Sequence, residues 1–327
     1  MKMNTILLSH TSDERKMLYS EQAIEELQRF AKIITNPHNR QLTESELIEL
    51  AQEATIVITT VRAAGSKALF ENAPHLTAFI RCGVDIRNID LAAASDNNIM
   101  VCNCPGIYEA PVVELVIGYL CCISRGIVTH HQNLRQGIME RYTTPDLYHK
   151  TLGLVGYGAI AKKVAITAKT LGMRVKVFDP FVSELGSNEE LVSFKELLTT
   201  SDFVSLHAVL NDETEGMIGP KELSWMKSDA WLINTGRGLL IQEDALYQAL
   251  VNKKIAGAAL DVFATEPDIL ASSLLTLDNV IVTPHIGGWS DRVYKELSMK
   301  TVEIVRTIVA GKIPETTVNK SLLSLNG

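Results

Sequence analysis

The sequence predicts an α/β protein made of two doubly wound parallel sheets. Three observations predict this class. Short apolar strand-like segments alternate with helical segments up to about residue 104, the same alternation returns from residue 151, and a Pro-Gly break followed by a long apolar helix separates the two series. A chain of 327 residues is long enough for two hydrophobic cores. We expect residues 1–104 and 288–327 to form one domain and residues 105–287 the other.

The first series contains five strand-like segments and the helices that join them. The strands are expected at 5–9, 31–35, 55–60, 76–81 and 99–102. The helices are expected at 13–30, 44–51, 66–71 and 89–94. After Pro105-Gly106, a mostly apolar helix over 110–131 carries the chain into the second domain.

The second series contains six strand-like segments. The strands are expected at 151–155, 174–178, 203–207, 230–234, 257–261 and 280–283. The helices are expected at 159–171, 194–199, 220–226 and 242–250. A last amphipathic helix over 290–310 is expected to return to the first domain.

A glycine motif follows the first strand of the second series. Gly156, Gly158 and Ala161 have the spacing G-x-G-x-x-A at the start of a helix. The glycines permit a sharp turn and close approach to a pyrophosphate, and the small third residue lets helix and strand pack. The helix N-terminus favours the anionic pyrophosphate.

An acid completes this unit. Asp179 ends the second strand, where its carboxylate can accept hydrogen bonds from an adenosine ribose. The carboxylate would repel a 2′-phosphate, so the sequence predicts NAD rather than NADP as the cofactor.

Charge, hydropathy and cysteine spacing exclude several classes of partner and site. The net charge of −7 and the pI near 5.7 give no basic footprint for nucleic acid, and we predict neither nucleic acid nor a membrane as a partner. The apolar start is too short for a signal peptide, so a cytoplasmic location is expected. Cys102-x-Cys104 lacks a second pair of ligands at zinc spacing, and no metal site is predicted.

Three later strands end in residues suited to chemistry, at the sheet edge where ligands bind in α/β proteins. Arg237 lies between glycines and can hold a carboxylate with two hydrogen bonds. His285 follows a strand in a Pro/Gly-rich turn and titrates near neutrality. Glu266, beside Pro267, is the carboxylate expected to orient His285 and favour its protonated form.

These segments resemble the D-isomer-specific 2-hydroxyacid dehydrogenase family. The similarity covers the glycine motif, SDFVSLH at 201–207, NTGRG at 234–238, DVFATEP at 261–267 and TPHIGG at 283–288, and it includes NCPG at 103–106. It extends over most of the chain from about Leu76 onward, and before Leu76 only the alternation of strands and helices supports it. At R-x-G, residues 81–83, the chain resembles the phosphoglycerate dehydrogenase branch, and no C-terminal regulatory domain is expected.

The resemblance implies a flavodoxin-like substrate domain, a Rossmann cofactor domain and a cleft between them. It implies that His285 acts as acid or base, that Glu266 keeps His285 protonated, and that Arg237 orients the carboxylate of a 2-hydroxy or 2-oxo acid. It also implies a homodimer formed through the cofactor domain. Besides Gly156, Gly158 and Asp179, the cofactor-binding residues expected are Ala159, Ile160, His207, Thr235, Gly236, Asp261 and Gly287.

The substrate loop departs from the family pattern. Arg81, Val84 and Asp85 are expected to bind substrate, but Asp85 stands where the family usually has glycine, and Arg87 stands where it usually has an acid. Asp85 could disfavour an anion unless Arg87 or Arg81 compensates. If the substrate carries a phosphate, Arg62 and Arg81 are the side chains that could donate hydrogen bonds to it. Two functions stay open: a dehydrogenase, and an NAD(H)-sensing corepressor-like protein with little or no turnover.

Overall fold

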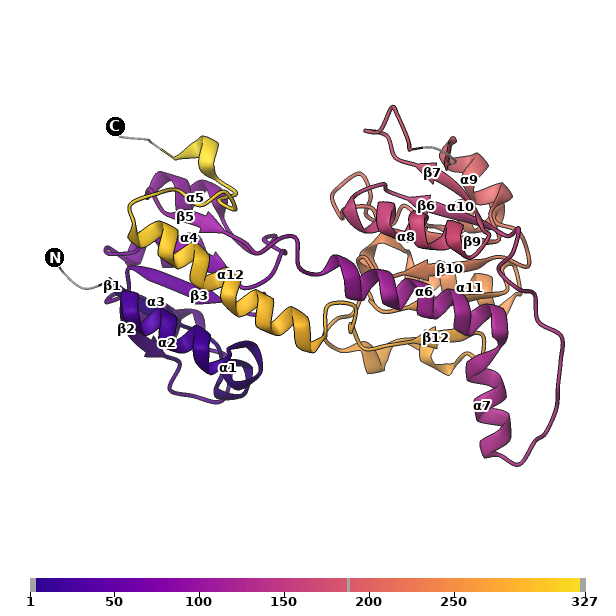
Figure 1. The fold of residues 1–327 in the computed structure, drawn as a ribbon, viewed down its shortest axis with the longest axis horizontal. Helices are drawn as coiled ribbons and strands as arrows, with labels where there is room; N and C mark the ends of the chain where they lie inside the picture. The colour runs from indigo at the N-terminus through magenta and orange to yellow at the C-terminus, as the bar shows by residue number, and fades with distance from the viewer. Residues whose placement is uncertain (1–3, 187–188, 324–327) are drawn as a thin grey trace. The chain divides into compact units, whose positions relative to one another are not determined.

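The computed structural model describes residues 4–186 and 189–323. The chain divides into two compact units, Met1–Ile107 with Trp289–Gly327, and Tyr108–Gly288 (Figure 1). The predicted boundaries after residues 104 and 287 lie three residues and one residue from these divisions.

The first unit contains a five-stranded parallel sheet in the order β2-β1-β3-β4-β5. Its strands are β1 (Asn4–Leu8), β2 (Ala31–Thr35), β3 (Ile56–Thr59), β4 (Ala78–Arg81) and β5 (Met100–Cys102). Every residue of β3 and β4 is buried, as expected for inner parallel strands that helices cover on both faces.

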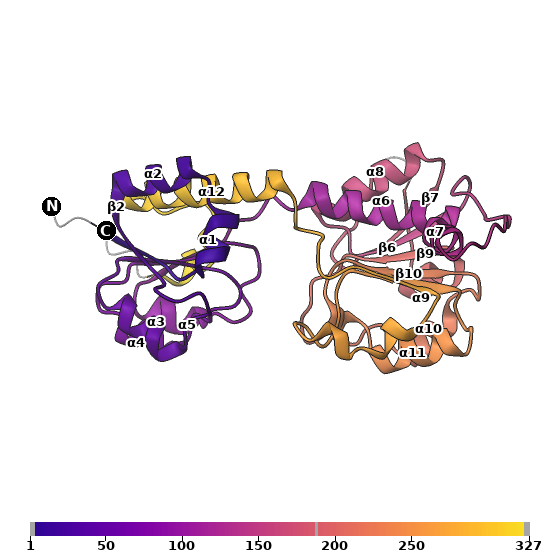
Figure 2. The same cartoon turned by 90° about the horizontal axis from the view of Figure 1, so that it is seen from below.

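Two helical layers enclose this sheet (Figure 2). One layer contains α1 (Ser12–Leu18) and α2 (Glu21–Phe30), each of which packs on α12 (Asp291–Val309). The other contains α3 (Glu44–Ala51), α4 (Lys67–Asn72) and α5 (Leu91–Asp96). The last long helix therefore returns to the first unit, as predicted.

The second unit contains a seven-stranded parallel sheet in the order β12-β11-β10-β9-β6-β7-β8. Its strands are β6 (Thr151–Val155), β7 (Arg174–Phe178), β8 (Glu189–Leu191), β9 (Phe203–Leu206), β10 (Trp231–Asn234), β11 (Gly257–Leu260) and β12 (Val280–Val282). The strand order reverses between β6 and β9, which makes their carboxyl ends the expected position of a ligand crevice.

Helices cover both faces of this sheet as well (Figure 2). One layer contains α6 (Glu109–Arg125) and α8 (Ala159–Thr170), with α7 (Ile127–Arg135) following α6. The other contains α9 (Phe194–Thr200), α10 (Pro220–Trp225) and α11 (Glu243–Val251). The short 3-10 helices are η1 (Gly238–Leu240), η2 (Ile269–Ala271), η3 (Ser273–Thr276) and η4 (Lys320–Leu322). The two sheets confirm the predicted fold class.

Two segments that the sequence predicts as single helices each form two helices in the structure. The segment 13–30 is broken because Ser20 starts α2 as its N-cap, its side chain accepting the amide of Ala23 at 3.2 Å. The segment 110–131 is broken at Gly126, whose φ of +57° ends α6. The strand β8 was not expected.

No single helix in the described part of the chain is long and apolar enough to cross a membrane; α6 and α7 meet the length and hydropathy test only together, and they are bent by 62°.

Candidate active site

The glycine motif forms an open cradle at the carboxyl end of β6. Gly156 has a φ of +89°, and a Cβ on it would lie 2.8 Å from backbone atoms of His207 and Ala208, so a side chain is excluded there. A Cβ on Gly158 would meet no described atom within 4 Å. Gly158 is also the N-cap of α8, without a side-chain capping bond among the described residues. These amides and this space fit an anionic group such as a pyrophosphate.

Asp179 lies directly after β7 and is bonded to the same loop. Its Oδ2 accepts the amide of Tyr157 at 2.8 Å, and its Oδ1 accepts the amide of Phe181 at 2.9 Å. The carboxylate is half-buried. The acid therefore supports the glycine loop, and its predicted contact with a ribose stays a prediction.

Three further groups of predicted cofactor residues follow the strands β9, β10 and β6. The His207 Nε2 lies 3.0 Å from the Ser205 Oγ, and burial lowers the pKa of His207 to about 4, which keeps its ring neutral. The buried Thr235 Oγ1 has no hydrogen-bond partner among the described residues. Ala159 and Ile160 form the first turn of α8, where Ala159 is exposed and Ile160 packs against the core. A bound dinucleotide could contact the exposed first turn of α8 and form a hydrogen bond with the Thr235 hydroxyl.

The loop that carries Arg237 is fixed from both sides. Asn234, fully buried at the end of β10, accepts the Gly236 amide at 3.0 Å and donates to the Arg237 carbonyl at 2.9 Å. A Cβ on Gly238 would lie 1.9 Å from the carbonyl carbon of Phe263. The Arg237 loop therefore packs backbone to backbone on the loop that leads to Glu266, and Gly238 is required for this approach.

His285 and Glu266 form a hydrogen-bonded ion pair. The His285 Nδ1 lies 2.7 Å from the Glu266 Oε2, and the Glu266 Oε1 accepts the Phe263 amide at 3.0 Å. The side chains are 49% and 31% exposed, respectively. Because Glu266 occupies Nδ1, the other ring nitrogen, Nε2, is the one that can exchange a proton with a ligand.

The pair shifts the pKa of both members. The hydrogen bond to Glu266, followed by the charges of Glu266 and Asp261, raises the pKa of His285 above its usual value against the opposing effects of burial and Arg237. Burial opposes ionisation of Glu266, but its bonds to His285 and the Phe263 amide and the nearby cations lower its pKa overall. Protonated His285 beside ionised Glu266 is therefore the favoured state.

Asp261 anchors the turn that presents His285. It is 1% exposed, and its carboxylate accepts the amides of Ile286 and Gly287, each at 2.8 Å, and the hydroxyl of Thr283. The Asp261 carbonyl also accepts the His285 amide at 2.8 Å. These bonds hold His285 at a φ of +55°, in the left-handed region.

The substrate loop lies in the first unit, after β4. Val84 is 42% exposed, and Asp85 is paired with Arg87. Arg81, also expected to bind substrate, is fully buried; its Nη2 donates to the Asn88 Oδ1 at 2.6 Å and to the Ala63 carbonyl at 3.1 Å, whereas its Nε and Nη1 have no hydrogen-bond partner among the described residues. As the last residue of a buried strand, it faces the interior.

Some supporting residues were missed by the sequence reasoning. The Tyr119 hydroxyl is hydrogen bonded to the Thr283 Oγ1, which connects α6 to the Asp261 anchor. Glu243, in the first turn of α11, accepts the Ala264 amide at 3.1 Å and is bonded to the Ser272 hydroxyl. Thr283 lies inside the T-P-H-I-G-G motif, so the sequence could have indicated its supporting role. Tyr119 and Glu243 lie far along the chain from the motifs that they support, so no local pattern indicates them.

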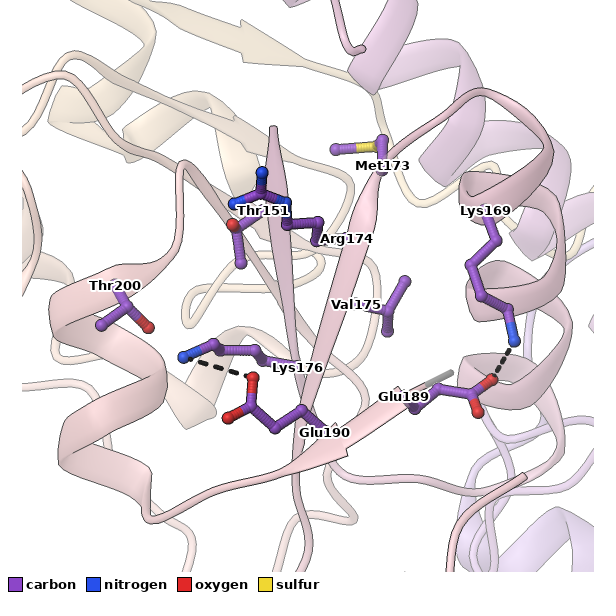
Figure 3. A pocket seen from close by; sticks show the side chains of 9 residues that line it. All are labelled: Thr151, Lys169, Met173, Arg174, Val175, Lys176, Glu189, Glu190 and Thr200. Carbon is purple, nitrogen blue, oxygen red and sulfur yellow. Dashed lines mark hydrogen bonds and ion pairs between the residues drawn. The ribbon is translucent and has the colours of Figure 1, made fainter. Parts of the chain in front are cut away.

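A cavity of about 830 Å³ lies at the opposite edge of the second sheet (Figure 3). Its lining includes Thr151 and Arg174, the first residues of β6 and β7. The ion pairs Lys169–Glu189, at 2.5 Å, and Lys176–Glu190, at 3.5 Å, also belong to its lining. It is separate from the edge that carries the glycine cradle, Arg237 and His285.

Comparison with known proteins agrees with this geometry. A family model described as the NAD-binding domain of the D-isomer-specific 2-hydroxyacid dehydrogenases matches residues 117–287. The glyoxylate reductase of Thermococcus litoralis is 34% identical over 318 residues, which cover 93% of this chain and 95% of that protein. The structure of the TT0316 protein from Thermus thermophilus has a TM-score of 0.87 and 29% identity, with 96% and 99% of the two chains covered.

The D-3-phosphoglycerate dehydrogenase of Methanocaldococcus jannaschii is 36% identical over 284 residues, or 85% of this chain. This chain spans about half of that relative, 54% of its length.

The fold and the glycine cradle define the second unit as the NAD-binding domain of an oxidoreductase. The chain belongs to the D-isomer-specific 2-hydroxyacid dehydrogenase family, and residues 117–287 match the NAD-binding domain of that family.

Proposed function

We propose that this chain interconverts a 2-oxo acid and a D-2-hydroxy acid with NAD as its cofactor. The observation that carries the proposal is the ion pair of His285 and Glu266, 2.7 Å apart, on the same sheet edge as Arg237 and the glycine cradle. In reduction, a 2-oxo acid, NADH and one proton give the 2-hydroxy acid and NAD⁺. NADH, when bound, supplies the hydride that C2 of the substrate receives.

The residues of this chain supply the remaining functions. Arg237 binds the substrate carboxylate and orients the carbonyl, since a guanidinium matches a carboxylate with two parallel hydrogen bonds. His285 donates a proton from Nε2 to the carbonyl oxygen as C2 is reduced, and it accepts that proton in the reverse direction. Glu266 fixes the ring and stabilises its protonated form.

Turnover with a panel of 2-oxo acids tests the proposal. NADH oxidation, followed by absorbance, is expected with at least one small 2-oxo acid such as glyoxylate or hydroxypyruvate. Tight NADH binding without turnover of any acid in the panel would contradict it and would favour the NADH-sensing function instead.

We propose that Asp179 selects NAD over NADP. Its carboxylate would repel a 2′-phosphate, so Asp179→Asn is expected to reduce the preference for NAD, measured as the ratio of kcat/KM values, by about tenfold. The asparagine Oδ1 can still accept one of the two amides that Asp179 binds, so this variant removes the charge and keeps part of the support of the loop. Asp179→Ala removes both and is expected to weaken binding of both cofactors. An unchanged ratio in both variants would exclude this role.

We propose that the second unit forms the homodimer contact through α7 and the loop after it. Six large apolar or aromatic side chains are exposed there, between 40% and 76%: Ile127, Leu134, Ile138, Met139, Tyr142 and Tyr148. The double variant Leu134→Glu/Met139→Glu is expected to be monomeric by light scattering, whereas the wild type and the surface control Val251→Glu are expected to be dimeric. A monomeric wild type would contradict the proposal. The cytoplasmic location stays a prediction, which cell fractionation tests.

A further inference from the structure

Ser205 places a buried hydroxyl inside the second sheet, next to the expected cofactor crevice. It belongs to β9 and is fully buried. Leu154 of β6 and Ile233 of β10 flank it in register, and their apolar side chains are fully buried as well. A hydroxyl in such apolar surroundings requires a hydrogen-bond partner.

That partner is the ring of His207, two residues further along the chain and therefore on the same face of the sheet. The Ser205 Oγ lies 3.0 Å from the His207 Nε2, and among the described residues the ring is the only group to which this hydroxyl is bonded. The hydroxyl has one proton, and a neutral imidazole has one proton that either nitrogen can carry. The pair therefore has two possible arrangements, which place the ring proton on different nitrogens.

The count of protons favours one arrangement. If Nε2 carried the ring proton and donated it to Ser205, the hydroxyl proton would be buried without an acceptor in the described part of the chain, which is costly. If Ser205 donates to an unprotonated Nε2, its proton is used and the ring proton lies on Nδ1. Burial lowers the pKa of His207 to about 4, so the ring does not take up a second proton at neutral pH.

The other ring nitrogen, Nδ1, is accessible. His207 is half-buried. Its Nδ1 has no hydrogen-bond partner among the residues that the structure describes and, in contrast to the Thr235 Oγ1, is not closed off from solvent. A proton on Nδ1 can therefore be donated to a bound molecule.

His207 lies beside the glycine cradle. Its amide donates to the Val155 carbonyl at 2.7 Å, and a Cβ on Gly156 would lie 2.8 Å from its carbonyl group. The strand order reverses between β6, which leads into the cradle, and β9, which leads to His207, and ligands of such sheets bind at the reversal. A dinucleotide at this edge carries phosphate and ribose oxygens that can accept a hydrogen bond.

We propose that Ser205 is a positioning residue for NAD(H): it holds the His207 ring with its proton on Nδ1, from which the ring donates to an oxygen of the bound cofactor. The inference rests on the NAD binding that is part of the proposed function, and it does not depend on which acid is turned over. Without the Ser205 hydroxyl both tautomers are accessible, and the one protonated on Nε2 presents a lone pair at Nδ1 to the cofactor oxygens.

The tautomer can be observed directly. ¹⁵N NMR of the histidine rings at neutral pH distinguishes a protonated from an unprotonated nitrogen, and the His207 signals are identified by their loss in His207→Asn. In the wild type, Nδ1 is expected to be protonated and Nε2 unprotonated, and saturation with NADH is expected to shift the Nδ1 signal. A protonated Nε2 in the wild type, or an Nδ1 signal that NADH leaves unchanged, would overturn the inference.

One variant tests the role of the hydroxyl. Ser205→Ala is expected to move the ring toward the tautomer protonated on Nε2. It is also expected to raise the Kd for NADH, measured by fluorescence titration, by about three- to tenfold, the usual contribution of one hydrogen bond. Ser201→Ala is the matched control, because Ser201 is also fully buried in this unit but its Oγ has no hydrogen-bond partner among the described residues. The control is expected to keep the wild-type tautomer and Kd.

The outcomes separate the inference from the proposed function. Weaker NADH binding by Ser205→Ala with the wild-type tautomer, an unchanged Kd, or an equal loss of affinity in Ser201→Ala overturns the inference while NAD binding stands. If thermal unfolding shows that Ser205→Ala does not fold, the ring spectra of the wild type with and without NADH decide. A wild type that binds no NADH contradicts the proposed function, and the inference with it.

Discussion

The variant His285→Ala is expected to lower kcat for 2-oxo acid reduction by about 10²–10⁴-fold, the usual contribution of a general acid. The imidazole is the proton donor in the proposed mechanism, and it is held by the Glu266 carboxylate at 2.7 Å. NADH affinity, measured by fluorescence titration, is expected to change little. The glycine cradle follows β6 in the same unit, and its amides do not depend on the imidazole.

The His285→Gln variant serves as the companion, because its amide can still form hydrogen bonds but does not take up a proton near neutral pH. It is expected to be as inactive as His285→Ala. If either variant kept wild-type kcat while binding NADH normally, His285 would have no place in the mechanism.

The variant Glu266→Gln is expected to move the pH dependence of reduction to lower pH and to reduce kcat at neutral pH by about tenfold to a hundredfold. Reduction needs protonated His285, so activity falls as the pH rises through the pKa of that residue. Glu266 raises this pKa most, and its removal leaves burial and Arg237, which lower the pKa, against only the charge of Asp261, which raises it. The protonated form is then lost at a lower pH than in the wild type.

Oxidation of the 2-hydroxy acid gives the opposite sign, since neutral His285 is the base. In Glu266→Gln, the oxidation rate is therefore expected to stay high down to a lower pH than in the wild type. A full pH profile of kcat/KM in both directions, together with NMR titration of the His285 ring, measures the shift. If the pH profiles of Glu266→Gln coincided with those of the wild type, Glu266 would not control the protonation of His285.

Much of the fold follows from local sequence. The strand at 31–35 and the helix at 44–51 have the predicted bounds, because β-branched and apolar residues form the first and Thr43 caps the second through a capping box. The two helix breaks were missed for a specific reason. Ser20 and Gly126 stand inside continuous amphipathic patterns, and periodicity alone does not distinguish a tolerated serine or glycine from a cap.

The edge strand β8 was also missed. It has three residues, two of them glutamates, and it gains its strand conformation from pairing with β7 rather than from a local pattern.

Some features of the candidate site could likewise be predicted from the sequence, and others could not. The pairing of His285 with Glu266 could be predicted because both follow parallel strands, whose carboxyl ends share one edge. The burial of Arg81 could not, since its partner Asn88 is brought to it by the folded loop. The requirement for Gly238 depends on an approach to Phe263 that no local pattern encodes.

The division of the chain into two units has a consequence for how such a protein diverges. The residues proposed for proton transfer and NAD binding all belong to Tyr108–Gly288, whereas Asp85 and Arg87 belong to the other unit. The loops of the first unit can therefore change in sequence while the residues proposed for proton transfer and NAD binding stay the same.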